Sequence, residues 1–205
     1  MGSVDRPQAP GPVGHPDAVA GVVLAAGRSR RFRAPKQLAL LRGKPLLAHV
    51  LDIALEAGLE PVVAVVPVWL TPPAGRPSHR LRWIRNPNPE RGMAHSLRLA
   101  LQALEEATGA ALVLLGDQPT LPGNAIAAVI AARGSRPVVA ARAQGRIGHP
   151  VLIERSHWWL VDEISGDGGL RTLLQARPEL VTPVSVAMHA ADVDTPEDLR
   201  AMEDA

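Results

Sequence analysis

The sequence has no cysteine, and this absence excludes a whole group of functions. Disulfide-stapled scaffolds, thiolate zinc sites and cysteine nucleophiles all need that side chain. The sequence also has no apolar run of the roughly 18 residues that a membrane span requires. Residues 1–17 are rich in proline and glycine and lack the apolar core of a signal peptide. We therefore expect a flexible N-terminal tail over 1–17, a single domain over 18–205, a cytoplasmic location and no membrane partner.

Acidic residues are missing from one stretch of the chain. No Asp or Glu lies between Asp17 and Asp52, whereas seven cations do: Arg28, Arg30, Arg31, Arg33, Lys36, Arg42 and Lys44. The only two lysines of the chain, against 20 arginines, are both in this stretch. A formal net charge of +2 is too small to favour nucleic acid. A local cationic surface favours a compact polyanion, although a solvated basic face explains the charge run equally well.

Apolar runs and helical patterns alternate along the chain, which predicts an α/β fold with a mostly parallel central sheet flanked by helices. Strands are expected at 18–26, 61–66, 81–85, 110–115, 137–141 and 181–187, and helices at 45–57, 93–107, 126–132, 158–164 and 170–175. Residues 145–152 are expected to be a loop that enters a strand. A last helix is expected after Thr195, with Thr195 as N-cap and Pro196 in the first turn.

The first predicted strand leads straight into the basic stretch, with Gly27 expected to supply the turn. A Walker A loop needs a second glycine before the lysine and a hydroxyl after it, and the residues around Lys36 provide neither. The dinucleotide fingerprint Gly-x-Gly-x-x-Gly is also absent after this strand. A phosphate would therefore be bound by backbone N–H groups near Gly27 and by cations such as Arg31 and Lys36. On spacing alone, Lys36 could equally be an exposed salt-bridge lysine.

Two carboxylate positions complement this loop. Asp117 follows an apolar run and a glycine, so it is expected at the tip of a core strand, where ligands of α/β folds bind. A carboxylate there can hold Mg²⁺ beside a triphosphate, because Mg²⁺ takes one or two carboxylates together with phosphate oxygens and water. Asp192 and Asp194 provide the second candidate. The alternatives are a turn aspartate at 117 and helix-terminus acids at 192 and 194.

Other catalytic classes are disfavoured by their missing motifs. His95, Ser96 and His149 could suggest a hydrolase, but the sequence has no Gly-x-Ser-x-Gly elbow. The seven histidines show no His-Glu-x-x-His or similar spacing, so a zinc enzyme is not expected.

The segment Leu24-Ala-Ala-Gly-Arg-Ser-Arg-Arg-Phe-Arg-Ala-Pro-Lys36 resembles the Leu-Ala-x-Gly-x-Ser-x-Arg-x-Gly-x-x-Lys signature of the MobA-like nucleotidyltransferases. The likeness extends over about residues 19 to 204 and is strongest to the molybdenum cofactor cytidylyltransferase branch. Further matches are Asn86-Pro…Gly92-Met93…Ser96-Leu97, Leu115-Gly-Asp-Gln-Pro119, Gly148-His-Pro-Val-Leu152, Gly166-Asp-Gly-Gly-Leu-Arg171 and Asp192-Val-Asp-Thr-Pro-Glu-Asp198.

This resemblance implies a Rossmann-like, GT-A-type nucleotidyltransferase fold and Mg²⁺-dependent transfer of a nucleotide from CTP to the phosphate of the molybdenum cofactor. A molybdoenzyme is the partner that it suggests. It assigns catalytic roles to Lys36, Arg31 and Asp117, and the metal to Asp117 and Asp194. It places the nucleotide against Leu24, Ala25, Ala26, Gly27, Arg28, Arg31, Lys36, Gly92 and Ser96. It places the acceptor against Gly148, His149 and Pro150.

Two points stay open at this level. Arg33 stands where the family signature has a glycine, and glycine permits backbone angles that arginine resists, so the loop either bends differently or gains a phosphate contact. The resemblance also allows GTP in place of CTP, or a sugar phosphate or phospholactate as acceptor. Alanine at position 26 favours CTP. A chaperone that holds a cofactor without catalysis is the alternative from a different functional class.

Overall fold

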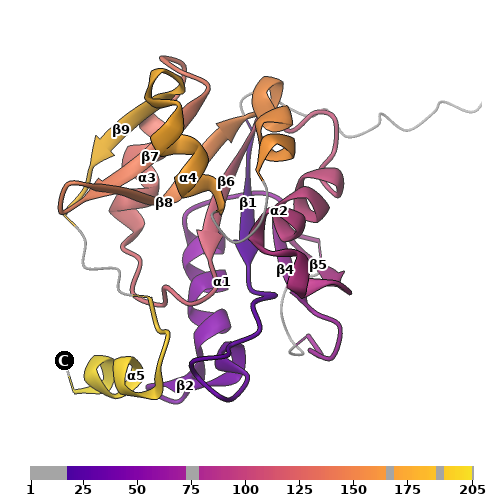
Figure 1. The fold of residues 1–205 in the computed structure, drawn as a ribbon, viewed down its shortest axis with the longest axis vertical. Helices are drawn as coiled ribbons and strands as arrows, with labels where there is room; N and C mark the ends of the chain where they lie inside the picture. The colour runs from indigo at the N-terminus through magenta and orange to yellow at the C-terminus, as the bar shows by residue number, and fades with distance from the viewer. Residues whose placement is uncertain (1–17, 73–78, 165–168, 188–191, 205) are drawn as a thin grey trace, which may run out of the picture.

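The computed structural model describes residues 18–72, 79–164, 169–187 and 192–204 (Figure 1). The tail expected at 1–17, and most of the Gly166–Gly169 segment, lie outside these ranges. The strands are β1 (Val19–Leu24), β2 (Leu40–Leu41), β3 (Lys44–Pro45), β4 (Val62–Pro67), β5 (Leu81–Asn86), β6 (Ala110–Leu115), β7 (Val138–Ala143), β8 (Arg146–Glu154) and β9 (Val181–Ser185). The α-helices are α1 (Leu46–Glu56), α2 (Met93–Gln102), α3 (Gly123–Ala131), α4 (Gly169–Ala176) and α5 (Pro196–Glu203). The 3₁₀ segments are Lys36–Leu38, Pro89–Arg91, Arg155–Glu163 and Pro178–Leu180.

Seven strands form one sheet in the order β5-β4-β1-β6-β8-β7-β9. β1 pairs in parallel with both β4 and β6, β5 pairs in parallel with β4, and β9 pairs in parallel with β7. Only β8 runs against its neighbours β6 and β7. The sheet is therefore mostly parallel, as the sequence predicts, with one reversed strand.

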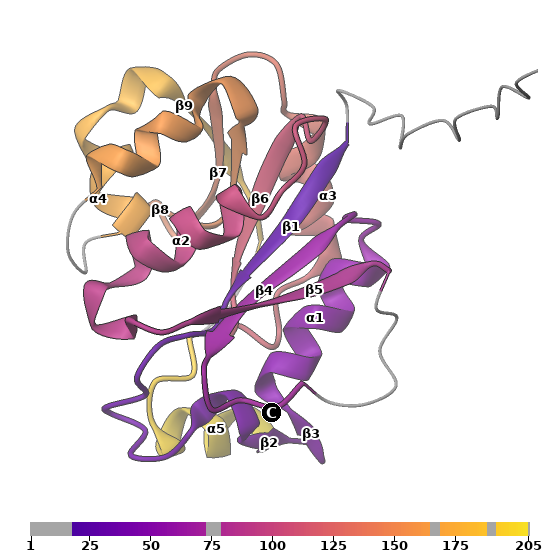
Figure 2. The ribbon, with the colours of Figure 1, turned by 90° about the vertical axis from the view of Figure 1, so that its right-hand side faces the viewer.

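Helices cover both faces of this sheet, so it has two hydrophobic cores (Figure 2). Helices α1 and α3 pack on one face, whereas α2, α4 and the segment Arg155–Glu163 pack on the other. Every residue of β4 is buried, and five of the six in β1. Strands buried on both faces must be apolar at each position, which is why these strands appear in the sequence as unbroken apolar runs. Among the described residues, no helix is long and apolar enough to cross a membrane.

Three predictions of local structure are wrong. The segment expected to be a helix at 158–164 is a 3₁₀ helix over Arg155–Glu163. Strand β8 already begins at Arg146, where a loop is expected, because it pairs with β7 as the second arm of a hairpin. Helix α2 ends at Gln102 rather than near residue 107. The predicted last helix is confirmed, since Thr195 and Asp198 form a reciprocal capping box at the start of α5.

The carboxyl ends of β1 and β6 lie directly side by side. Leu24 pairs with Leu115, and the amide of Gly116 donates to the carbonyl of Leu24 at 2.9 Å. The approach is so close that a Cβ on Gly116 would lie 2.7 Å from the Cβ of Ala25. The loop after β1 and the loop that carries Asp117 therefore start from the same point of the sheet.

Gly116→Ala is expected to destabilise the protein by about 1–3 kcal/mol, because the new methyl group overlaps Ala25 and the backbone has to shift. Gly123→Ala is the matched control, since a Cβ on Gly123 meets no atom within 4 Å. Urea denaturation of the two variants measures the difference. Equal midpoints would show that the contact at Gly116 is looser than the structure indicates.

Candidate functional site

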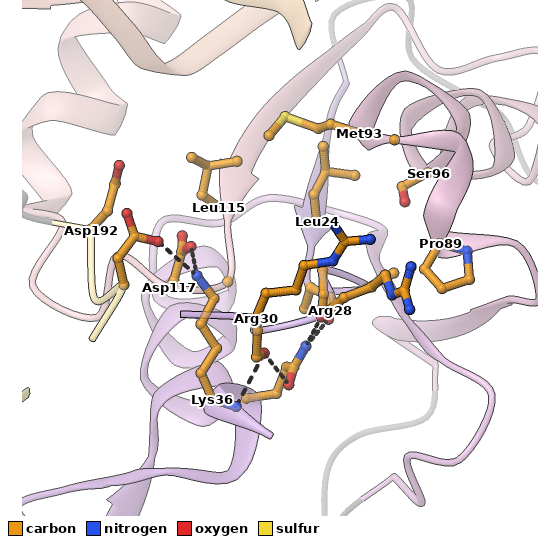
Figure 3. Close-up of a pocket in the computed structure, with 18 of the residues that line it drawn as sticks. Leu24, Arg28, Arg30, Lys36, Pro89, Met93, Ser96, Leu115, Asp117 and Asp192 are labelled. Carbon is orange, nitrogen blue, oxygen red and sulfur yellow. Dashed lines mark hydrogen bonds and ion pairs between the residues drawn. The ribbon is translucent and has the colours of Figure 1, made fainter. Parts of the chain in front are cut away.

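A cavity of about 550 Å³ opens at this edge of the sheet, where β1 and β6 end. Figure 3 shows Lys36 on the same side as Asp117 and Asp192, whereas Arg28 points toward Pro89 at the entrance to α2. The lining includes every residue that the sequence predicts to bind nucleotide or metal: Leu24, Ala25, Ala26, Gly27, Arg28, Arg31, Lys36, Gly92, Ser96, Asp117 and Asp194. The cavity thus joins a cationic loop from one part of the chain to carboxylates from two others.

Lys36 lies at the centre of the charged end of this cavity. Its Nζ donates to Asp117 Oδ2 at 2.5 Å and lies 3.4 Å from Asp194 Oδ1. Arg31 Nη2 contacts the other oxygen of Asp194 at 2.7 Å. The Lys36 side chain is only 15% exposed, so the interpretation of Lys36 as an exposed salt-bridge lysine is wrong. The structure brings together the four charged residues that the sequence assigns to phosphate and metal.

Gln37 holds the loop in shape, although no pattern in the sequence singles this residue out. Its buried amide donates to the carbonyls of Ala25 at 2.8 Å and Gly27 at 2.9 Å. The hydroxyl of Ser29 accepts from the amide of Lys36 at 3.3 Å. These hydrogen bonds connect the beginning of the loop to its end, and the carbonyls of Ala25 and Gly27 point toward Gln37. The one signal in the sequence was its position directly after Lys36.

Gly27 does not supply the turn, so that expectation is wrong: the chain turns over residues 30–33. The positive φ angles of the loop belong to Ser29, at 50°, and Arg33, at 58°. A Cβ on Gly27 would meet no atom within 4 Å. A small residue at 27 therefore keeps the cavity wall open rather than bending the backbone.

Arg33→Gly is expected to stabilise the protein by about 1 kcal/mol, because an L-residue at a φ of 58° is strained and glycine is not. Arg33 thus adopts a left-handed backbone conformation of the kind that glycine favours. Urea denaturation of Arg33→Gly beside Arg33→Ala measures the effect. Equal stability of these two variants would contradict the backbone strain at position 33.

The opposite wall is formed by the start of α2. Gly92 precedes the helix with φ 85°, and Ser96 lies one turn inside it. Ser96 is buried, and its hydroxyl accepts from the side-chain amide of Asn86 at 2.9 Å. That bond fixes Ser96 as part of the wall. The neighbouring His95 has a buried Nε2 without a hydrogen-bond partner among the described residues. No hydrolytic triad is assembled here from the described residues.

Asp192 adds a third carboxylate to the lining. Burial raises the pKa of this carboxyl group, and the charges of Asp117 and Asp194 raise it further, while a hydrogen bond from Gln118 at 2.8 Å opposes the rise. Asp192 therefore holds its charge less readily than an exposed aspartate does. Asp117 and Asp194 are already ion-paired with Lys36 and Arg31, so Asp192 is the carboxylate at this end of the cavity that has no cation as direct partner among the described residues.

The residues predicted to bind the acceptor do not line the cavity. Gly148, His149 and Pro150 lie in β8, where pairing with β7 shifts between Ala140 and Ala141. The pairing of β8 with β6 stops at Val151, two residues short of the end of β6. The two strands thus separate at the edge of the sheet where Asp117 lies. His149 belongs to the part of β8 that is no longer paired with β6.

His149→Gln is expected to remove part of the acid sensitivity of the fold. His149 Nε2 is enclosed without a partner among the described residues, and burial, helped by the charge of Arg171, lowers the pKa of His149 to about 4. The unfolded chain takes up this proton near pH 6.5, so stability falls between about pH 6.5 and 4. The loss from this residue at pH 4.5 is about 2–3 kcal/mol.

Urea denaturation at pH 7 and pH 4.5 tests this expectation. The wild-type protein should lose more stability over this interval than His149→Gln, while the exposed His79→Gln variant should behave as wild type. The same pH dependence in all three proteins would contradict the enclosed position of His149.

The donor set fits a divalent metal bound together with phosphate. Asp117 Oδ1 is buried without a hydrogen-bond partner among the described residues, and Asp117 Oδ2 and Asp194 Oδ1 converge on the point that Lys36 Nζ now occupies. Within the described ranges, no group of three or more His, Asp and Glu side chains is arranged to hold a metal alone. Two carboxylates that leave the remaining positions to phosphate oxygens and water suit Mg²⁺.

The family profile of the MobA-like NTP transferase domain matches residues 21–181, which span β1 to the start of β9 and most of the cavity. The chain belongs to this family. It therefore carries an NTP transferase domain with the Rossmann-like α/β fold expected of that family. The matched range includes the cationic loop and Asp117, whereas Asp192, Asp194 and α5 follow it.

Relatives of this MobA-like NTP transferase match it over different lengths. The bifunctional protein GlmU of Anaeromyxobacter sp. strain Fw109-5 is 37% identical over 125 residues, which are 58% of this chain and 26% of GlmU. The chain thus corresponds to about a quarter of that relative's length. The purine catabolism protein PucB of Bacillus subtilis is 28% identical over 190 residues, covering 87% of this chain and 92% of PucB.

Solved structures agree with the fold of the MobA-like NTP transferase. Rv0371c from Mycobacterium tuberculosis is 26% identical, with a TM-score of 0.78 over 92% of this chain and 98% of its own. A second structure of Rv0371c, 25% identical with a TM-score of 0.75 over the same shares, is a complex with manganese. A protein of this fold therefore accepts a divalent metal.

Proposed function

We propose that the protein transfers CMP from CTP to the phosphate of the molybdenum cofactor, with release of pyrophosphate. The observation that carries nucleotidyl transfer is the convergence of Lys36 and Arg31 with Asp117 and Asp194 at one end of a cavity of about 550 Å³. Support for CTP comes from Ala26, which lines the cavity. The guanylyl branch of the family tends to have glycine at this position, whereas the cytidylyl branch tends to have alanine. Support for the acceptor comes from the resemblance to the cytidylyltransferase branch.

In the proposed reaction, an oxygen of the acceptor phosphate attacks the α-phosphorus of the nucleotide. The bond from the α-phosphorus to the oxygen that bridges it to the β-phosphorus breaks, and pyrophosphate leaves with that oxygen. Lys36 and Arg31 exchange their carboxylate partners for phosphate oxygens and neutralise the negative charge that grows there. Asp117 and Asp194 would hold Mg²⁺, which supplies further charge neutralisation and orientation. No nucleophile from the protein is needed, because positioning and charge carry the rate.

Gly148, His149 and Pro150 are proposed to contact the acceptor, since they lie where β8 parts from β6. An acceptor bound on this side would approach the edge of the sheet where β6 ends and Asp117 follows. A molybdoenzyme is the proposed recipient of the product.

A pyrophosphate-release assay with four NTPs, Mg²⁺ and a panel of acceptors tests this function. The panel includes molybdenum cofactor, a sugar phosphate and phospholactate. We expect release with CTP and molybdenum cofactor. Release with GTP would overturn the cytidylyl assignment, and release with a different acceptor would overturn the cofactor assignment. No release in any combination would contradict the catalytic role.

A further inference from the structure

Phe32, the one phenylalanine of the chain, lies inside the cationic loop between two arginines. Its side chain is only 8% exposed and packs in a small cluster with Leu41, Leu46 and Val193. Leu199 and Met202 of α5 pack against the same cluster. This cluster is separate from the two cores of the sheet, and it ties the cationic loop to the C-terminal segment.

Asp198 fixes that segment from the other side. Its Oδ2 accepts from the backbone amides of Asp194 at 3.0 Å and Thr195 at 2.7 Å. The amide of Val193 donates to the carbonyl of Asp117 at 3.0 Å. The backbone of residues 193–195 is thus held at both ends, and the carboxylate of Asp194 is presented to Arg31 and Lys36.

We infer that residues 193–202 form a C-terminal brace that positions the phosphate-binding loop, with Asp198 and Phe32 as positioning residues. Neither side chain lines the cavity. Asp198 acts through the backbone of Asp194, and Phe32 acts through the loop that carries Arg31 and Lys36. The inference rests on the proposed nucleotide site and adds a part of the chain that follows the matched family region.

If the brace positions the loop, a change in the brace should weaken the binding of Mg²⁺–CTP while the protein stays folded. In Asp198→Ala, the amides of Asp194 and Thr195 lose their acceptor, so Asp194 is no longer held toward Lys36. Partners that orient metal ligands are typically worth about 10–100-fold in affinity or activity. We expect Asp198→Ala to weaken Mg²⁺–CTP binding within this range and Asp198→Asn, which keeps an acceptor oxygen, to restore most of it.

Glu197→Ala is the matched control, because Glu197 lies in the same turn of α5 and ion-pairs with the exposed Arg200. Isothermal titration with Mg²⁺–CTP and with Mn²⁺ alone measures both affinities, and thermal melting confirms the fold. Asp198→Ala should bind both ligands more weakly than Glu197→Ala does. Equal affinities of the two variants would overturn the brace. A wild-type protein that binds no NTP would instead overturn the proposed function.

Phe32→Ala provides an independent test of the other side of the brace. Its control is Leu104→Ala, which removes a side chain of similar burial, 7% exposed, from a sheet core. Both changes should lower the melting temperature, but only Phe32→Ala should weaken Mg²⁺–CTP binding, and Phe32→Leu should restore it. Loss of affinity in Leu104→Ala to the same extent would show that general destabilisation explains the effect.

Discussion

Lys36→Met is expected to lower the rate of pyrophosphate release by about 10²–10³-fold, the usual effect of removing one donor that stabilises a transition-state oxyanion. Lys36 Nζ lies within 3.4 Å of both candidate metal carboxylates, so it is in place to meet a phosphate bound between them and the loop. Methionine keeps an unbranched apolar side chain of similar length and removes the ammonium group, with its charge and its N–H donors. The rate is measured with saturating Mg²⁺, CTP and molybdenum cofactor as acceptor.

Lys44→Met is the matched control for this experiment. Lys44 is the only other lysine of the chain and ion-pairs with Asp52, away from the cavity. Its replacement should leave the rate of pyrophosphate release unchanged. If Lys36→Met retained the wild-type rate, the ammonium group would be structural and Arg31 would have to carry the charge of the leaving group alone.

Asp117→Asn is expected to abolish measurable turnover while the fold survives. The change keeps the shape of the side chain but removes the charge that would hold the metal. Asp117 Oδ1 is a buried oxygen that has no hydrogen-bond partner within the described part of the chain. The loss of Mn²⁺ affinity and of pyrophosphate release should therefore occur together. Binding of Mn²⁺ is measured by titration and the fold by thermal melting.

Asp162→Asn controls for the loss of one carboxylate, because Asp162 is 75% exposed and pairs with Arg98 on the surface. It should bind Mn²⁺ and turn over as the wild-type protein does. Retained turnover in Asp117→Asn would remove Asp117 from the metal site and leave the ion pair with Lys36 as a structural contact.

The central sheet could be predicted because its strands are buried on both faces. β1, β4 and β6 are unbroken apolar runs, and a run of that kind between helical patterns has few other interpretations. β8 was harder, since its first residues, Arg146 to Gly148, are partly exposed and pair only with β7. A local pattern cannot show that a strand runs against its neighbours, because direction is decided by the hairpin that joins β7 to β8.

The two halves of the site were visible in the sequence, but their meeting was not. Lys36 and Asp117 are 81 residues apart, and they contact each other because β1 and β6 are neighbours in the sheet. Strand order is a property of the whole fold, so only the resemblance could predict it. Gln37 and Phe32 were missed for a related reason: each acts through buried contacts that carry no sequence pattern.

Equilibrium titration of the wild-type protein with the four NTPs, with Mg²⁺ and then with EDTA, tests most directly whether the cationic loop and the two carboxylates form one site. A bound NTP at 100 times its Kd should stabilise the protein by about 2.7 kcal/mol. That corresponds to a shift in Tm of several degrees, at about 2–4 °C per kcal/mol. We predict that CTP with Mg²⁺ binds most tightly and that EDTA weakens its binding. Absence of binding by every NTP, or binding that is indifferent to the metal, would contradict the account.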